Sequence, residues 1–227
     1  MNLPPIVLVT GTDTGVGKTI TTAALAATLH GRGRTVAVYK PCQSGNAQGD
    51  SDCAEVVRLA GPLTAEPGVV LEEPMAPVPA AELDAVQLPP VATHAERIRE
   101  LSATHDHVLV EGAGGLLVEL DHDGGTLADL GAHLGNAAAF TVVARPSLGT
   151  LNHTALTLEA LKRRAVPVVG VVLGSWPAAP GSVELSNRST MAGWPVPWVG
   201  AVPAHASGLG PAAFRTQAHV WLAGLPA

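Results

Sequence analysis

With 227 residues and a formal charge of −6 at pH 7, the chain can bury one substantial core, and no segment resembles a linker, so we expect a single domain spanning residues 1–227. The acidic balance and the scattered arginines argue against nucleic acid as a partner. Since no run approaches the roughly 20 apolar residues of a membrane span and no charged leader precedes the first strand, we expect a cytoplasmic protein without a membrane partner.

Short β-branched runs alternate with alanine- and leucine-rich stretches, which is typical of βαβ units. Strands are predicted at residues 6–10, 35–39, 108–111, 138–144, 168–173 and 199–202. Helices are predicted at residues 18–32, 52–60, 91–103, 126–135, 152–164, 183–192 and 211–222. Because the strands are almost entirely apolar, they predict an α/β fold with a mostly parallel sheet and helices on both faces.

The stretch 61–90 contains seven prolines, which interrupt any long periodic element. We therefore predict an irregular excursion here. It is either decoration or part of a ligand site, since loops beyond the carboxyl ends of parallel strands commonly bind ligands.

A glycine-rich loop, GTDTGVGKT from Gly11 to Thr19, joins the first predicted strand to the first helix. Its glycines allow backbone N–H groups to surround phosphate oxygens at a helix N-terminus. Lys18 would neutralise the outer phosphates, and the Thr19 hydroxyl would bind magnesium. A strict pattern has glycine where Thr12 stands, but the strand, loop and helix context favours a phosphate-binding loop over a plain turn. The fold is thus predicted to be P-loop NTPase-like.

Charged residues end the next two predicted strands. Lys40 follows the second strand, and Glu111 ends the third. Because neighbouring parallel strands bring their carboxyl ends to one rim, both are expected near the phosphate loop; a plain surface lysine is the alternative for Lys40. Asp50 and Asp52 lie where a polar loop becomes a helix, and only one of the two carboxylates needs to reach the metal; an N-cap role for one of them is the alternative.

The segment RPSLGTLNHT, residues 145–154, is a glycine turn that leads into a helix. Free N–H groups at such a helix start attract carboxylates or phosphates. Capping of the helix by Thr150 or Asn152 explains the same residues equally well.

Together, GTDTGVGKT, YKPCQSG, GDSD, VEGAGGLLVEL, PSLGTLNHTALTLEAL and GSWP, in this order, resemble the motifs of the dethiobiotin synthetase family. The resemblance covers most of the chain and is weakest at residues 61–90 and after residue 187. It implies a ligase of biotin biosynthesis that joins CO2 to 7,8-diaminononanoate. The resulting carbamate attacks a nucleotide γ-phosphate and then closes to the cyclic urea. The implied cofactors are Mg2+ and ATP or another nucleoside triphosphate.

The resemblance also assigns roles to residues. Lys18 and Lys40 would be catalytic, with Lys40 stabilising the carbamate and the transferring phosphoryl group. Thr19, Asp52 and Glu111 would hold Mg2+. The residues implied to bind the nucleotide are Thr14, Gly15, Val16, Gly17, Lys18, Thr19, Ile20, Asp52, Glu111, Gly112, Ala113, Gly114, Gly174, Ser175, Val202, Pro203 and Ala204. The substrate would contact Ser44 at its carbamate end, and its carboxylate would meet Gly149, Thr150, Leu151 and Asn152 of the second subunit of a homodimer.

One segment departs from the family pattern. Where many relatives have an asparagine that reads adenine, this chain has Gly174, followed by Ser175. Glycine cannot make that side-chain contact, so the sequence leaves the preferred base open.

Two other classes of protein are disfavoured. Partitioning ATPases carry an early loop lysine where Asp13 stands, and amidoligases usually add a glutaminase domain for which the chain has no room.

Overall fold

The computed structural model describes residues 3–49 and 51–227. Asp50, which was predicted as a possible metal ligand or cap, lies outside them. Within the described residues, seven strands form one sheet in the order β3-β2-β4-β1-β5-β6-β7, and every neighbouring pair is parallel. The strands are β1 (Ile6–Gly11), β2 (Val36–Gln43), β3 (Thr64–Val70), β4 (His107–Gly115), β5 (Ala138–Ala144), β6 (Val168–Trp176) and β7 (Trp198–Pro203).

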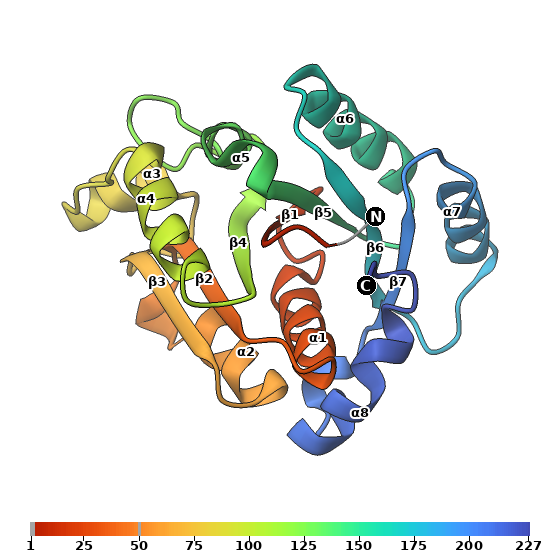
Figure 1. The fold of residues 1–227 in the computed structure, drawn as a ribbon. Helices are drawn as coiled ribbons and strands as arrows, with labels where there is room; N and C mark the ends of the chain where they lie inside the picture. Colours follow the sequence, from red (N-terminus) through yellow and green to blue (C-terminus); the bar gives the residue numbers. More distant parts are fainter. Residues whose placement is uncertain (1–2, 50) are drawn as a thin grey trace.

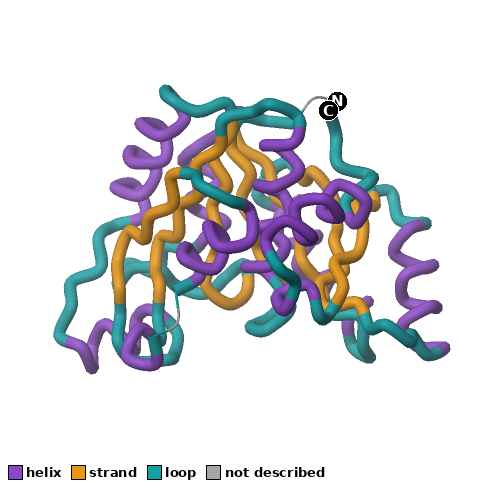
Figure 2. Tube along the Cα trace, turned by 90° about the horizontal axis from the view of Figure 1, so that it is seen from below, coloured by secondary structure: helices purple, strands orange, loops and turns teal. Residues whose placement is uncertain are grey.

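Helices cover both faces of this sheet (Figure 1). The helices are α1 (Lys18–Gly31), α2 (Asp52–Ala60), α3 (Pro77–Asp84), α4 (Val91–Ser102), α5 (Leu127–Leu134), α6 (Thr150–Arg163), α7 (Ser182–Ala192) and α8 (Pro211–Trp221). Helices α1, α2 and α8 pack together on one face, and α4 and α5 pack together on the other. The first and last described residues also meet, because the Leu3 N–H donates to the Ala227 carbonyl (3.1 Å) (Figure 2).

The buried strands form because their alternate residues supply two hydrophobic cores. In β1, Ile6 and Leu8 belong to one core cluster, whereas Val7 and Val9 belong to the other. This alternation follows from the two-residue period of a strand. All six predicted strands and all seven predicted helices are present, with ends displaced by at most a few residues. The predicted α/β fold is confirmed.

The prediction of an irregular stretch at residues 61–90 was wrong, because it contains β3 and α3. Strand β3 lies at the edge of the sheet and pairs only with β2. An edge strand tolerates Pro67, whose missing N–H removes no ladder bond that the sheet interior requires. Helix α3 begins at Pro77, a position where proline is favoured since the first helical N–H groups have no intrahelical partner.

Strand register determines where the charged strand ends lie. Tyr39 of β2 is level with Val110 of β4, and Val9 of β1 is level with Glu111. Lys40 therefore lies next to Glu111, one strand away from the start of the glycine loop. The two strands run on past these residues, to Gln43 and Gly115, so the prediction that they end at Lys40 and Glu111 was wrong, whereas the prediction that both residues lie near the phosphate loop is confirmed. None of the helices in the described ranges combines the length and apolar character that a membrane crossing requires.

Candidate functional site

A cleft of about 910 Å3 opens at this rim. The phosphate loop, the ends of β2 and β4, the start of α2 and the segment before α3 form its walls. The predicted site residues that line it are Thr14, Gly15, Gly17, Lys18, Thr19, Ile20, Lys40, Ser44, Asp52, Glu111, Gly112, Ala113 and Gly114. Residues 74–77 also line it, so this part of the proline-rich stretch contributes to the cleft.

The glycine loop folds as the motif predicts. Gly15 and Gly17 have left-handed backbones (φ 71° and 98°), which glycine adopts without a steric penalty. The loop is anchored to the sheet, since the Thr12 N–H donates to the Val143 carbonyl (2.9 Å). Lys18 is buried, and its ammonium donates to the Asp13 carbonyl across the loop (3.1 Å). Burial lowers the pKa of Lys18 below its ordinary value.

Four side chains converge beside this loop, and we refer to Thr19, Lys40, Asp52 and Glu111 as the Lys40 cluster. Thr19 Oγ1 lies 2.7 Å from Asp52 Oδ1 and 2.8 Å from Glu111 Oε1. Lys40 Nζ donates to Glu111 Oε1 (3.0 Å) and also forms an ion pair with Asp52 Oδ2. Lys40 and Glu111 are buried, with side chains 7% and 1% exposed. A buried charged pair of this kind requires close partners, which the cluster supplies.

Asp52 is free to join the cluster because another residue caps its helix. Ser51 is the N-cap of α2, and its side chain accepts a hydrogen bond from the Ala54 N–H (3.2 Å). Asp52 is the first residue of the helix, and its own N–H donates to Gln43 Oε1 (3.1 Å). The capping alternative for Asp52 is therefore wrong.

The cluster keeps its charges. Burial opposes the Lys40 ammonium, but Glu111 and then Asp52 outweigh burial and raise the pKa of Lys40 above its ordinary value. Burial likewise opposes the Asp52 carboxylate, yet Lys40 holds its pKa below the ordinary value. Near pH 7 the two groups form an ion pair.

The oxygen atoms of the cluster fit a hard divalent cation. The Thr19 hydroxyl has one proton, so it can donate to Asp52 or to Glu111 but not to both, although it touches both. Glu111 Oε2 is buried and has no hydrogen-bond partner among the described residues. Two carboxylates and one hydroxyl, completed by nucleotide phosphates, are a donor set that suits Mg2+.

Five of the residues implied to bind the nucleotide, Gly174, Ser175, Val202, Pro203 and Ala204, lie outside the lining of the cleft. A Cβ placed on Gly174 would lie 2.0 Å from the Val16 carbonyl oxygen, so no side chain fits there without moving the loop. Ser175 has a left-handed backbone (φ 56°), which is unusual for a residue other than glycine. The Ala204 N–H donates to the Trp176 carbonyl (2.8 Å), which places the end of β7 beside this segment.

Residues 149–152 are also separate from the cleft lining of their own chain. Gly149 is the N-cap of α6, and no side chain caps this helix, so the prediction that Thr150 or Asn152 caps it was wrong. Thr150 is buried, and its hydroxyl has no hydrogen-bond partner among the described residues; Asn152 is exposed. The Thr150 N–H donates to the Ser147 carbonyl (3.3 Å), whereas the N–H groups of Leu151 and Asn152 have no partner in the described part of the chain.

Sequence reasoning missed several residues that line the cleft, among them Gln43, Arg58 and Met75. Gln43 supports the rim, because it accepts from Asp52 and donates to the Ser44 carbonyl (2.9 Å). Arg58 and Met75 line the cleft. Gln43 lies inside the YKPCQSG motif, which is the one signal that could have identified it, whereas Arg58 and Met75 carry no motif.

The chain matches known proteins over most of its length. Residues 6–210 match the family described as an AAA domain. The chain is 48% identical over 210 residues to an ATP-dependent dethiobiotin synthetase of Mycolicibacterium vanbaalenii, and the match covers 92% of each protein. It is 49% identical over 211 residues, again 92% of each, to a protein of the same name from Mycobacterium avium. A Mycobacterium leprae protein of that name is 52% identical over 188 residues, 82% of each.

Solved structures with a similar fold include a septum site-determining protein and a cell division ATPase. The Pyrococcus horikoshii protein, solved with Mg-ADP, superposes with a TM-score of 0.61 at 16% identity over 96% of each chain. The Pyrococcus furiosus protein gives a TM-score of 0.60 at 18% identity, over 96% of this chain and 98% of the other. At such identities the likeness bears on the fold alone, and it confirms the predicted P-loop NTPase-like architecture.

Proposed function

Because the chain belongs to the family of ATP-dependent dethiobiotin synthetases, we propose that it makes dethiobiotin from 7,8-diaminononanoate and CO2 in biotin biosynthesis, using ATP. The observation that carries this proposal is the meeting of the phosphate loop and the Lys40 cluster in one cleft. A γ-phosphate held at Lys18 and a carbamate held at Lys40 would then be neighbours, as direct phosphoryl transfer requires.

The chemistry proceeds in two stages. A carbamate oxygen of the carboxylated substrate attacks the γ-phosphorus, and ADP leaves. The second amine then attacks the carbamate carbon, phosphate leaves, and the urea ring closes. Lys40 offsets the repulsion between the two anions of the first stage, and Lys18 binds the outer phosphates. Ser44 is half-buried in the lining of the cleft, where it would contact the carbamate end of the substrate.

Thr19, Asp52 and Glu111 would hold Mg2+, in keeping with their convergent oxygen atoms. When bound, the metal ion neutralises the growing charge on the phosphate oxygens. The protein supplies the rest: the phosphate loop orients the triphosphate, and the buried Lys40 presents its positive charge to the reacting groups.

We further propose a cytoplasmic homodimer of single-domain chains, with sites shared between subunits. The substrate carboxylate would bind the start of α6 in the neighbouring subunit, where the N–H groups of Leu151 and Asn152 favour an anion. Two large apolar side chains are exposed near this helix start, Leu148 (79%) and Leu156 (57%). Burying them against a second copy would stabilise the contact.

A product assay tests the function. The protein is incubated with 7,8-diaminononanoate, bicarbonate, magnesium and each nucleoside triphosphate, and dethiobiotin is measured by mass spectrometry. We expect dethiobiotin and one nucleoside diphosphate per turnover, with no product when bicarbonate is omitted. Nucleotide hydrolysis without dethiobiotin would contradict the proposal.

A further inference from the structure

The Lys40 ammonium occupies the position where positive charge is needed to balance Asp52 and Glu111. It contacts both carboxylates, whereas the other lysine of the cleft, Lys18, donates to the Asp13 backbone carbonyl instead. Among the described residues, Lys40 is the one cation paired with this carboxylate couple. Without it, two partly or fully buried negative charges would face each other around the Thr19 hydroxyl.

The ammonium and a divalent cation compete for the same two carboxylates. Glu111 Oε1 already accepts from Lys40 and contacts Thr19, which are 3.0 and 2.8 Å away. A metal ion on these carboxylates, even at the free Oε2 of Glu111, would place two positive centres within a few ångströms of each other beside buried side chains, which is unfavourable. A metal held by Asp52 and Glu111 therefore weakens the contacts of Lys40 with both carboxylates.

We propose that Lys40 is the resident counter-ion of the metal ligands: it holds Asp52 and Glu111 in place until a divalent cation arrives with the nucleotide, and it then moves to the substrate. This inference rests on the proposed function, since it concerns how that cleft is loaded. A metal ion that binds without nucleotide must displace Lys40 from the carboxylates, and it gains no further ligands in exchange. The metal with a triphosphate brings anionic oxygens, which supply the ligands that two carboxylates lack. The free protein should thus bind divalent cations weakly.

Lys40→Met tests this, because methionine fills a similar volume without charge. We measure Mn2+ binding by paramagnetic resonance, and the melting temperature with and without Mg2+, always without nucleotide or substrate. The variant should bind Mn2+ at least about tenfold more tightly than the wild type. Its melting temperature should be lower without metal and rise by about 3 °C or more with Mg2+. The wild type should change by less than about 1 °C.

Lys18→Met is the matched control, because it removes a lysine of the same cleft that does not pair with the carboxylates. It should gain no metal response. Adding Asp52→Asn to Lys40→Met should abolish the gain. If Lys40→Met folds only when Mg2+ is present, that result also supports the proposal, and Lys40→Gln, which keeps hydrogen-bond donors, then provides the Mn2+ measurement.

Equal Mn2+ affinity in the wild type and in the Lys40 variants would overturn the inference, as would an equal gain in Lys18→Met. Neither measurement involves turnover. A negative result here therefore leaves the synthetase proposal standing, and a negative product assay leaves the metal-binding comparison intact.

Discussion

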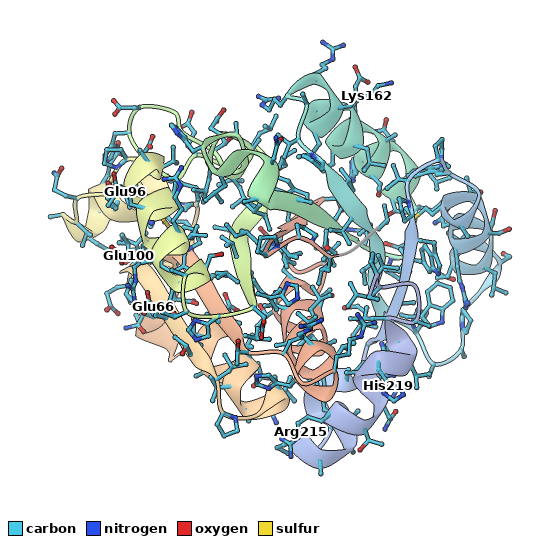
Figure 3. The ribbon with its side chains drawn as sticks, viewed as in Figure 1. Glu66, Glu96, Glu100, Lys162, Arg215 and His219 are labelled. Carbon is cyan, nitrogen blue, oxygen red and sulfur yellow. The ribbon has the colours of Figure 1, made fainter. Side chains whose placement is uncertain are left out.

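The three lysines of the chain lie in two different settings. Lys18 and Lys40 are buried in the cleft, whereas Lys162 is exposed on α6, at the outside of the molecule (Figure 3). Because phosphoryl transfer depends on positioned charge, Lys18→Ala and Lys40→Ala should each lower turnover by at least roughly a hundredfold. Lys162→Ala should retain normal turnover. Steady-state rates are measured beside circular dichroism and melting curves, and near-normal turnover in folded Lys40→Ala would remove that residue from the mechanism.

Base recognition is a second prediction at the scale of single residues. With glycine at position 174, no carboxamide is present there to distinguish adenine from other bases. CTP, GTP and UTP should therefore support dethiobiotin formation within about tenfold of ATP, a difference of about 1.4 kcal/mol. Initial rates with the four nucleotides decide this. A preference for ATP above roughly a thousandfold would show that backbone groups alone read adenine.

The structure refines this prediction, because Gly174 is also needed by the phosphate loop. Gly174→Asn would bring its Cβ within 2.0 Å of the Val16 carbonyl oxygen, and backbone cannot move away easily. We expect this variant to lose affinity for all four nucleotides, instead of becoming selective for ATP. Gly208→Ala is the control, since a Cβ there meets open space. Selectivity for ATP with unchanged triphosphate affinity would contradict the steric argument.

Site residues that lie at or soon after the end of an apolar run could be predicted from the sequence. Lys18, Lys40 and Glu111 are such residues, and a parallel sheet brings the carboxyl ends of these runs to one rim. Arg58 and Met75 could not be predicted, because their place in the cleft depends on how α2 and the segment before α3 pack. The ion pair between Asp13 and Arg145 likewise joins distant parts of the chain.

At the scale of elements, Asp121 connects the loop after β4 to the start of α4. Its buried carboxylate accepts hydrogen bonds from the N–H groups of Val91 (2.8 Å), Asp123 (3.1 Å) and Gly125 (2.7 Å), and the N-cap residue of α4, Pro90, makes no side-chain cap of its own. Asp121→Ala leaves these donors without partners, so the free energy of unfolding should fall by about 3 kcal/mol. The melting temperature should fall by roughly 6 to 12 °C.

Thermal and urea unfolding measure this effect. Asp123→Ala is the matched control, because Asp123 is exposed two residues away and its side chain forms no hydrogen bond in the described part of the chain. The control should stay within about 0.5 kcal/mol of the wild type. If the two variants are equally stable, Asp121 does not hold α4 in place.

Elements with a strongly periodic or apolar sequence could be predicted, whereas elements that form because of their place in the folded sheet could not. The apolar runs of β1 and β5 identify buried strands without any knowledge of their neighbours. In β3, by contrast, most residues are half-buried or exposed, so no apolar run marks it. Its proline is acceptable only because the strand lies at the sheet edge, and the sequence does not state where an edge will be.

At the scale of the whole molecule, the proposed dimer makes each site depend on two chains. Lys18→Ala disables the phosphate loop, and Asn152→Trp blocks the exposed helix start with a bulky side chain. Each variant alone should be inactive. After subunit exchange, every heterodimer contains one site built from intact parts, so part of the activity should return. A large substitution is chosen because loss of one hydrogen bond costs only about 0.5 to 1.5 kcal/mol.

The mixture is assayed for dethiobiotin, with exchange verified by mass spectrometry of differently tagged subunits. Recovery in the mixture and none in either parent supports the shared site. Absence of recovery despite verified exchange would show that each subunit binds its substrate alone.

The central place of β1 has a consequence for the newly made chain. This strand pairs with β4 and β5, whose residues lie about a hundred or more positions further along the sequence. At roughly 5 to 20 residues per second, a ribosome needs on the order of 6 to 25 s to add them. During that interval the apolar residues 6–9 leave the exit tunnel before the strands that will pair with them have been made. Nascent-chain chaperones should therefore bind this segment first and release it only after β5 has emerged.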